Sequence, residues 1–328
     1  MSRNKLRALS GVLAIVLFLS AFIATGPQAV SAEKNYKFIA VTHSATISFW
    51  NPMKRGLKDA AKQLEASHEG LEISVEHLGP QLFDVSKQRE ILVNAIASEP
   101  DGLIVSLPDS TAFDKPVQDA LDKGIPVVAM NTDDPGENPR MAFVGQDLVA
   151  SGRQLGEQIV RLVGESGKVA IGTSAPGHTA LEARLKGAKQ VLDKAGVKYK
   201  ILDTTADLTK AVSTFQSYLT SNPDADGIFA VDGTGTDAVG NVVRTMGLKG
   251  QVHGGGFDLV VGTLEDIKNG FTDFTLDQHP YLQGYYPVLE LFNYLEYGIQ
   301  PSDIDTGAGV INQENVEEVL KLADEGYR

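Results

Sequence analysis

Short apolar runs alternate with amphipathic segments along almost the whole chain after its first 32 residues. Segments such as MKRGLKDAAKQLEA and KQREILVNAIAS repeat apolar residues at helical spacing and predict helices. Ten β-rich runs predict strands: KFIAVT, LEISVEHL, GLIVSL, PVVAMN, MAFVGQ, KVAIGTS, KYKILDTT, GIFAVDG, VHGGGFD and FTDFTLDQ. Unbroken apolar strands that alternate with helices are typical of parallel sheets covered on both faces.

The strand–helix series occurs twice, over residues 37–131 and again over 168–258, with similar spacing although the letters differ. The sequence therefore predicts an α/β protein of two Rossmann-like lobes, each with a parallel sheet. Ligands of such sheets bind at the carboxyl ends of the strands, and a cleft between two lobes is a common place for a small molecule.

The first 32 residues follow a different pattern. Arg3, Lys5 and Arg7 precede the short apolar core GVLAIVLFLSAFIA, and the small residues AVSA follow it. This order predicts an export signal that is cleaved after Ala32, and hence an exported protein. A membrane span is disfavoured because the apolar core is short. About 296 residues remain, which is enough for two domains.

Charge and cysteine content exclude several classes of protein. The net charge is −13, and removal of the basic signal makes it −16. A nucleic-acid partner is not expected, because binding nucleic acid depends on cationic contacts to phosphate. The chain has no cysteine, so disulfides do not stabilise it and buried apolar surface must do so.

Aromatic, carboxylate and amide side chains and one guanidinium follow the predicted strands at their carboxyl ends. A sugar or polyol suits such a set, because its C–H faces pack on aromatic rings and its hydroxyls both donate and accept hydrogen bonds. An anionic ligand would require more positive charge. The candidate ligand-binding residues are His43, Phe49, Trp50, Asn131, Arg184, Asp232, Asp258 and Gln278.

All candidates except His43 also have an interpretation without a ligand. In that interpretation Phe49 and Trp50 are core residues that anchor the following helix, and Arg184 is a solvated residue on a helix surface. Asp258 and Gln278 would then only cap helices, and Asp232 and Asn131 would only form turns.

A second functional hypothesis comes from GIFAVDGTGTDAVG. Gly233, Gly235 and Ala238 have the G-x-G-x-x-A spacing of dinucleotide-binding loops, and Asp258 follows at a suitable distance, so an NAD(P)-dependent oxidoreductase is an alternative. Asp232 argues against it, since a carboxylate beside the first glycine repels a pyrophosphate. The six histidines form no metal-binding or catalytic motif, and GTSAPG is not a nucleophile elbow. We therefore expect no enzyme activity, no cofactor and no metal.

Six motifs in order resemble a known family. They are SFWNPMKRGLKDAA, IPVVAMN, TALEARLKG, GIFAVDGTGTDAVG, GGGFD and LDQHPYLQGYYPV. Together they resemble the periplasmic solute-binding proteins of sugar ABC transporters, in the branch that binds ribose, galactose and allose. The resemblance covers the mature chain and implies the type I periplasmic binding protein fold, with a three-segment hinge.

The resemblance also assigns roles. Phe49 and Trp50 would stack on the sugar, and the amides, carboxylates and guanidinium at the other candidate positions would bind its hydroxyls. His43 is an additional candidate contact. Thr132 stands where ribose binders often have arginine, and Leu208 where some have a third aromatic. These departures weaken the assignment to ribose and leave the sugar-like class of the ligand unchanged.

The hinge crossings are expected near Gln146, Gln278 and Thr306. They divide the chain into an N-terminal lobe of 33–146 plus 279–306 and a C-terminal lobe of 147–278 plus 307–328. A monomer is expected to close on its ligand and deliver it to a membrane permease. Docking to a chemoreceptor is an alternative. Repressors with this fold carry a DNA-binding head, which is not found before NYKFIAV.

Overall fold

Two six-stranded sheets form the framework of the protein, and both have the same strand order. The first has the order β11-β5-β4-β3-β1-β2, and the second has the order β12-β10-β9-β8-β6-β7. In the first sheet β1 pairs parallel with β3, β3 with β4, β4 with β5 and β5 with β11. In the second sheet the pairings among β6 to β10 are parallel, and β12 pairs antiparallel with β10. The predicted α/β fold with two similar lobes is confirmed.

The computed structural model describes residues 34–134, 136 and 138–328. The predicted export signal and its cleavage after Ala32 lie outside these residues. The strands of the first sheet are β1 (Lys34–Val41), β2 (Leu71–Leu78), β3 (Gly102–Val105), β4 (Val127–Met130), β5 (Ala142–Gly145) and β11 (Ile304–Asp305). Those of the second are β6 (Lys168–Thr173), β7 (Lys198–Asp203), β8 (Gly227–Ala230), β9 (His253–Phe257), β10 (Phe274–Asp277) and β12 (Gly309–Asn312).

All ten predicted runs form strands. The sequence did not predict β11 and β12, because they are short and lack a long apolar run. The helices are α2 (Trp50–Ser67), α3 (Val85–Ala97), α4 (Asp114–Asp122), α5 (Leu148–Val163), α6 (Thr179–Ala195), α7 (Leu208–Ser221), α8 (Gly233–Thr245), α9 (Val261–Lys268), α10 (Pro280–Tyr297) and α11 (Val316–Asp324).

Successive residues of a strand point to opposite faces of the sheet, and a core cluster covers each face. Along β1, Phe38 and Ala40 pack in one core cluster with residues of α2 and α10. Ile39 and Val41 pack in a second cluster with residues of α3 and α4. The second sheet divides in the same way between two further clusters. The lobe built on the first sheet is called the first lobe below, and the other the second lobe.

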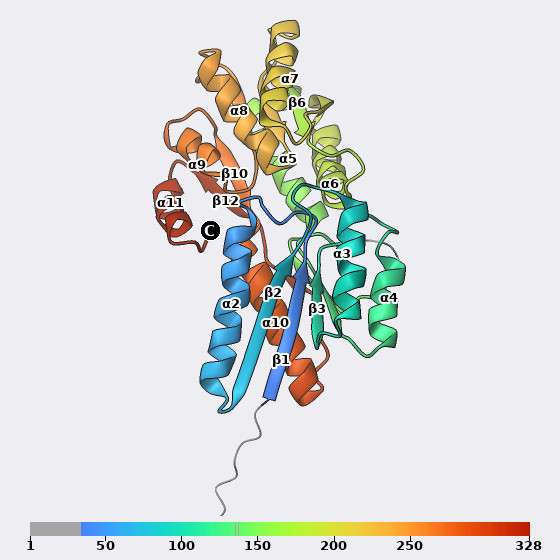
Figure 1. The fold of residues 1–328 in the computed structure, drawn as a ribbon. Coiled ribbons are helices and arrows are strands. Elements are labelled where there is room, and N and C mark those ends of the chain that lie inside the picture. Colours follow the sequence, from blue (N-terminus) through green and yellow to red (C-terminus); the bar gives the residue numbers. More distant parts are fainter. Residues whose placement is uncertain (1–33, 135, 137) are drawn as a thin grey trace, which may run out of the picture. The chain divides into compact units, whose positions relative to one another are not determined.

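Glycines allow two helix pairs to pack at very short range. Figure 1 shows α10, from late in the chain, beside α2 from its start. A Cβ on Gly284 would lie 2.1 Å from the backbone oxygen of Met53, and one on Gly56 would lie 2.0 Å from that of Tyr281. In the second lobe, Gly152 and Gly187 play the same part between α5 and α6, each with a backbone oxygen 2.1 Å from its added Cβ.

The chain passes between the two sheets three times. It leaves the first sheet after β5 and enters the second at β6, returns after β10 into α10, and crosses again between β11 and β12. The segment α10 belongs to the first lobe because it packs on α2, β4 and β5. Within the described part of the chain, no helix combines the length and the apolar composition needed to cross a bilayer.

Replacement of Gly284 by alanine should destabilise the first lobe, because a methyl group would meet backbone atoms that cannot move aside. We expect Gly284→Ala to lower the free energy of unfolding by about 1–3 kcal/mol, the usual cost of overpacking. Urea titration followed by circular dichroism measures it. Lys62→Ala, on the exposed face of α2, is the control and should change the free energy by less than about 0.5 kcal/mol. Equal stability of the two variants would contradict the packing argument.

Candidate functional site

The eight candidate residues lie after strands of both sheets. Hydrogen bonds join Asn131, Gln278 and Asp258, and ring contacts join His43, Phe49 and Trp50. His43, Phe49 and Trp50 follow β1, Asn131 follows β4, Asp232 follows β8 and Asp258 follows β9. Gln278 follows β10, and Arg184 lies in the second turn of α6, which follows β6. Because both sheets direct these ends toward the chain crossings, residues far apart in sequence come into contact there.

A chain of amides joins the two lobes. Asn131 of the first lobe donates from Nδ2 to Oε1 of Gln278 at 3.0 Å. Gln278, at the second crossing, donates from Nε2 to Oδ1 of Asp258 in the second lobe at 2.5 Å. Asn131 and Gln278 are both at least nine-tenths buried. The polar groups expected to meet a ligand therefore hydrogen-bond to one another across the lobes.

Arg184 is buried at the centre of the second lobe. Its guanidinium donates from Nη1 to the backbone oxygen of Val231 at 2.9 Å and from Nη2 to Oε1 of Gln146 at 3.2 Å. Its Cζ lies 4.0 Å from the centroid of the Phe257 ring, which is a cation–π distance. Burial lowers the pKa of Arg184, and the nearby carboxylates of Asp258 and Asp232 oppose that effect. The interpretation of Arg184 as a solvated surface residue is wrong.

One nitrogen of the Arg184 guanidinium makes no hydrogen bond to the described residues. The Nε atom is buried and has no hydrogen-bond partner among the described residues. Buried donors are normally paired, so an unused N–H beside two carboxylates is a place where a ligand oxygen would be favourable.

Asp232 and Asp258 are acceptors with different structural roles. Asp232 accepts from the backbone N–H of Gly235 at 2.9 Å and of Ser174 at 2.8 Å, so it caps α8. Asp258 does not cap α9, whose N-cap is Val260. Burial raises the pKa of both carboxyl groups, and the N–H of Gly233 partly offsets this at Asp258.

The backbone is left-handed at two of the candidate positions. Asn131 has φ of 65° and Asp258 has φ of 74°, which non-glycine residues seldom adopt. Both residues also make the amide chain between the lobes. Such strain persists where the surrounding structure holds it, and it is frequent at functional sites. Gln278 does not cap α10, since His279 precedes that helix.

The proposed dinucleotide loop is blocked by its own acids. A pyrophosphate would require the free N–H groups at the start of α8. Asp232 occupies the N–H of Gly235, and the N–H of Gly233 is bonded to Asp258. Two carboxylates therefore lie where the phosphates would have to be, and the structure gives no support to the oxidoreductase alternative.

The aromatic pair does not lie as expected. Trp50 has no exposed surface, packs in the core of the first lobe and donates from Nε1 to Oγ of Ser44 at 3.1 Å. The expectation that its ring forms an exposed platform is therefore wrong for this conformation, because Trp50 begins α2 on the face turned toward the sheet. Phe49 is half-buried and packs edge-on against Trp50 at a centroid distance of 4.8 Å.

His43 extends this aromatic group toward the second lobe. Its ring lies 5.2 Å from that of Trp50 and 5.3 Å from that of His178, which caps α6. Phe83 packs against both imidazoles, at 5.7 Å from His43 and 5.2 Å from His178. Close by, the N–H of Thr179 donates to the backbone oxygen of Pro108 at 3.3 Å. The loops of the first lobe therefore contact the start of α6 directly.

Sequence reasoning missed His178, Phe83 and Gln283. His178 stands six residues before Arg184 and directly before the motif TALEARLKG, so its place at the start of the arginine helix was a usable signal. Gln283 lies one residue before the close-packed Gly284, and its burial on α10 could not be read from spacing. Leu208, the position noted for a missing aromatic, is 39% exposed at the start of α7.

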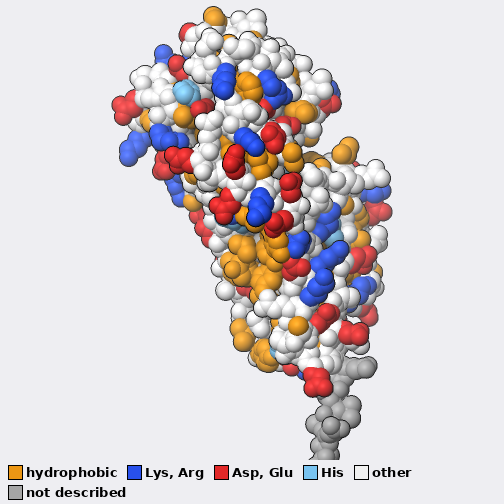
Figure 2. Space-filling model, turned by 90° about the vertical axis from the view of Figure 1, so that its left-hand side faces the viewer, with side chains coloured by type: hydrophobic (Ala, Val, Ile, Leu, Met, Phe, Trp, Pro, Cys, Tyr) orange, Lys and Arg blue, Asp and Glu red, His pale blue; other side chains and the backbone are white. Residues whose placement is uncertain are grey.

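The surface hollows found among the described residues lie away from the candidate residues. Two hollows run along β2 and α2, and none of the eight candidates lines them. Among the described residues, no three His, Cys, Asp or Glu side chains are grouped to hold a metal ion. On the face drawn in Figure 2, acidic and basic side chains are interspersed, with no single-sign stripe of the described residues.

The histidines at the lobe contact should make stability depend on pH. Burial and the charge of Arg184 lower the pKa of His178 to about 4, and burial and His178 lower the pKa of His43 well below its usual value. A pKa below the unfolded value of about 6.5 means that stability is complete above pH 6.5 and falls as the pH drops toward 4. The imidazole of His178 should then account for a loss of about 2 kcal/mol between pH 7.5 and pH 5.

Urea unfolding at the two pH values measures this loss. His178→Asn keeps an acceptor for the N–H of Ala180, which the Nδ1 of His178 now accepts at 3.2 Å. The variant should therefore fold and lose about 2 kcal/mol less than the unsubstituted protein on acidification. The same pH dependence in both proteins would show that His178 is not the titrating group.

Comparison with known proteins places the chain in a family. Residues 38–299 match the model described as "Periplasmic binding protein domain". The xylose/arabinose-binding protein XylF of Sulfolobus acidocaldarius is 34% identical over 307 residues, which are 89% of this chain and 74% of that protein. The D-allose-binding periplasmic protein of Escherichia coli is 26% identical over 285 residues, which are 84% of this chain and 86% of that protein.

Solved structures agree. An ABC transporter solute-binding protein from Burkholderia graminis in complex with D-arabinose superimposes with a TM-score of 0.79 at 27% identity, over 86% of this chain and 97% of that one. A solute-binding protein from Agrobacterium vitis bound with α-D-tagatopyranose does so with a TM-score of 0.77 at 26% identity, over 86% and 96%. The family match covers most of the chain and the fold is shared along its length, so this protein belongs to the periplasmic binding protein family.

Proposed function

We propose that the protein is an exported solute-binding protein that captures a monosaccharide or related polyol and delivers it to an ABC transporter permease. The observation that supports it most is the connected set of donors and acceptors drawn from both lobes, from Asn131 through Gln278 to Asp258. Relatives named for xylose, arabinose and allose, and two neighbours with a bound sugar, support the same ligand class.

A sugar would be held by exchange of hydrogen bonds. Its hydroxyls would donate to Asp232 and Asp258 and to the oxygen of Asn131, and its oxygens would accept from Gln278 and from the unused Nε of Arg184. Phe49 would pack on a C–H face, with Trp50 as the rigid support beneath it. His43 and His178 would close the side formed by the start of α6. Hydrogen bonds to charged groups contribute about 1.5–3 kcal/mol each, which favours hydroxyls at this site.

Closure of the two lobes on a ligand is expected because the groups that would contact the ligand come from both lobes. The contacts with Asn131 and Phe49 come from the first lobe, and those with Arg184, Asp232 and Asp258 from the second. A ligand that reaches both sets binds the closed arrangement more tightly and shifts the population toward it. The lobes would be 33–146 plus 279–306 and 147–278 plus 307–328, with crossings near Gln146, Gln278 and Thr306.

The remaining parts of the proposal concern location and assembly. The export signal would be removed after Ala32, and the mature protein would work as a monomer in the periplasm. The permease would recognise the closed form. We expect no catalysis, because the carboxylates of the site cap backbone N–H groups and bond to amides and do not flank a free nucleophile.

A thermal-shift panel of pentoses, hexoses and polyols tests the ligand class. A ligand at 100 times its dissociation constant should stabilise the folded protein by about 2.7 kcal/mol and raise the melting temperature. The single tryptophan provides a second signal through its fluorescence. A shift with NAD and with none of the carbohydrates would replace this proposal by the oxidoreductase alternative.

Arg184→Lys tests the proposed ligand contact. A lysine has one ammonium group and cannot donate to Val231, to Gln146 and to a ligand as the forked guanidinium does. We expect binding of the identified sugar to weaken at least about tenfold, or about 1.4 kcal/mol, by isothermal titration calorimetry. Arg161→Lys, exposed near the end of α5, is the matched control and should bind normally. Unaltered affinity of Arg184→Lys would remove Arg184 from the site.

A further inference from the structure

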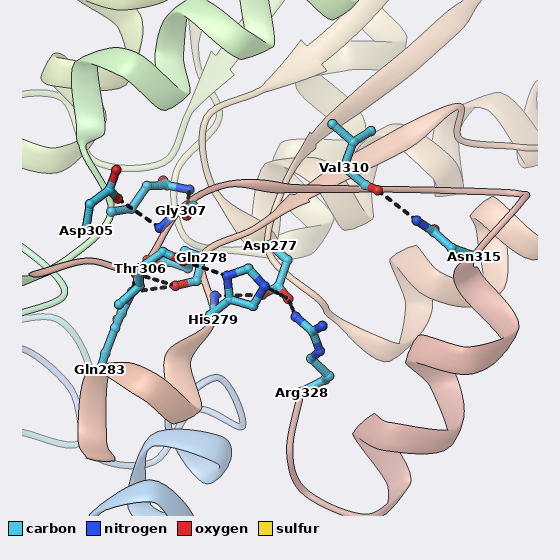
Figure 3. Close-up of polar contacts among 11 residues, drawn as sticks. Asp277, Gln278, His279, Gln283, Asp305, Thr306, Gly307, Val310, Asn315 and Arg328 are labelled. Carbon is cyan, nitrogen blue, oxygen red and sulfur yellow. Dashed lines mark hydrogen bonds and ion pairs between the residues drawn. The ribbon is translucent and has the colours of Figure 1, made fainter. Parts of the chain in front are cut away.

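Gln283 is a fully buried glutamine in the first turn of α10 that touches two chain crossings and one candidate ligand contact. Its Nε2 donates to the backbone oxygen of Gln278 at 2.8 Å and lies 3.4 Å from Oγ1 of Thr306. Its Oε1 accepts from Nδ2 of Asn131 at 3.0 Å. Figure 3 shows Gln283 reaching toward Gln278 and Thr306, where the second and third crossings lie side by side.

Hydrogen bonds join all three crossings. The hydroxyl of Thr306 donates to the backbone oxygen of Gln278 at 2.9 Å. Gln146, at the first crossing, donates from Nε2 to the backbone oxygen of Gly307 at 3.2 Å, and its Oε1 accepts from Arg184. The crossing residues Gln278 and Gln146 therefore also hold the side chains of Asn131 and Arg184.

Gln283 also determines what Asn131 can offer a ligand. Both hydrogens of the Asn131 amide are used, by Gln278 and by Gln283, each at 3.0 Å. Its oxygen accepts one bond, from the hydroxyl of Thr132 at 3.0 Å. A carbonyl oxygen has two lone pairs, so Asn131 retains acceptor capacity and no donor capacity. Asn131 would thus recognise a hydroxyl donor.

We propose that Gln283 is a positioning residue for ligand capture, which orients Asn131 as an acceptor and couples that orientation to the crossings at Gln278 and Thr306. The proposal rests on the proposed function for the ligand that Asn131 meets. The coupling between Gln283 and the lobe arrangement is a property of the ligand-free protein as well, so it can be measured without a sugar.

Gln283→Glu separates this role from simple packing. The ionised carboxylate has the same shape but no donor, so it would face the backbone oxygen of Gln278 with a second acceptor. When protonated, the acid can donate to that oxygen again, and burial raises the pKa of such a group toward neutral pH. A purely structural side chain would not make the lobe arrangement depend on pH in this way.

The measurement is the distance between the lobes in the full mature protein. The chain has no cysteine, so Lys62→Cys on α2 and Lys194→Cys on α6, both at exposed positions, take spin labels at two defined sites. Pulsed electron paramagnetic resonance then compares ligand-free proteins at pH 8 and pH 5. We expect Gln283→Glu to be more open than the unsubstituted protein at pH 8 and to return toward it at pH 5.

Gln118→Glu is the control. Gln118 is an exposed glutamine on α4 whose amide donates to Oδ1 of Asp122 at 2.8 Å and touches no crossing. It should leave the distance distribution unchanged at both pH values. Thr306→Val, which removes one bond at the crossing without adding charge, should open the lobes at both pH values and provides an answer if Gln283→Glu does not fold.

Ligand binding gives the second reading. With the sugar found in the panel, Gln283→Glu should bind about tenfold more weakly at pH 8 relative to the unsubstituted protein, within the usual range for coupled sites, and recover at pH 5. Native distances in both crossing variants, or an opening of Gln283→Glu that ignores pH, would overturn the proposal. If no sugar binds the unsubstituted protein, the proposed function fails and the distance comparison still decides the coupling.

Discussion

Buried polar groups need hydrogen-bond partners, and here the central polar groups find them across the lobes and along the crossings. Asn131, Gln278, Gln283 and Arg184 are all at least nine-tenths buried, and each bonds to a residue from another segment. An unpaired buried group costs about 1–3 kcal/mol, so these bonds hold the lobes in a defined relation. A ligand can enter only by replacing some of them with bonds of its own.

This constraint explains why carboxylates and amides are suitable where cations are not. The N–H groups at the start of α8, which in other proteins attract phosphate, are already bonded to Asp232 and Asp258. What remains available is acceptor capacity on oxygens together with donor capacity on Gln278 and on the Arg184 guanidinium, whose Nε has no partner among the described residues. A neutral compound rich in hydroxyl groups complements that set, whereas an anion would be repelled by two acids.

The two lobes solve the same packing problem with different residues. In each, a pair of glycines brings two helices together at backbone distance, Gly56 with Gly284 and Gly152 with Gly187. The added Cβ of Gly152 would meet the backbone of Arg184, so close packing of α5 also sets the position of the arginine helix. The chemistry of the site thus depends on glycines that never approach a ligand.

Much of the architecture could be predicted because its signals are local. Strand and helix periods are properties of a few neighbouring residues, so the ten runs, the repeated series and the polar strand ends could be predicted from the sequence. The order of the strands in each sheet came from the structure. The structure decided which faces these residues turn inward and which partners they find. Trp50 lies in the core because it is the first residue of α2, on the face of the helix that packs against the first sheet. His178, Phe83 and Gln283 acquired their roles through contacts between distant segments, as with Asn131 and Gln278, which are 147 positions apart. The spacing of residues along the chain does not predict such pairs, because only the packing of helices and sheets brings them within hydrogen-bonding distance.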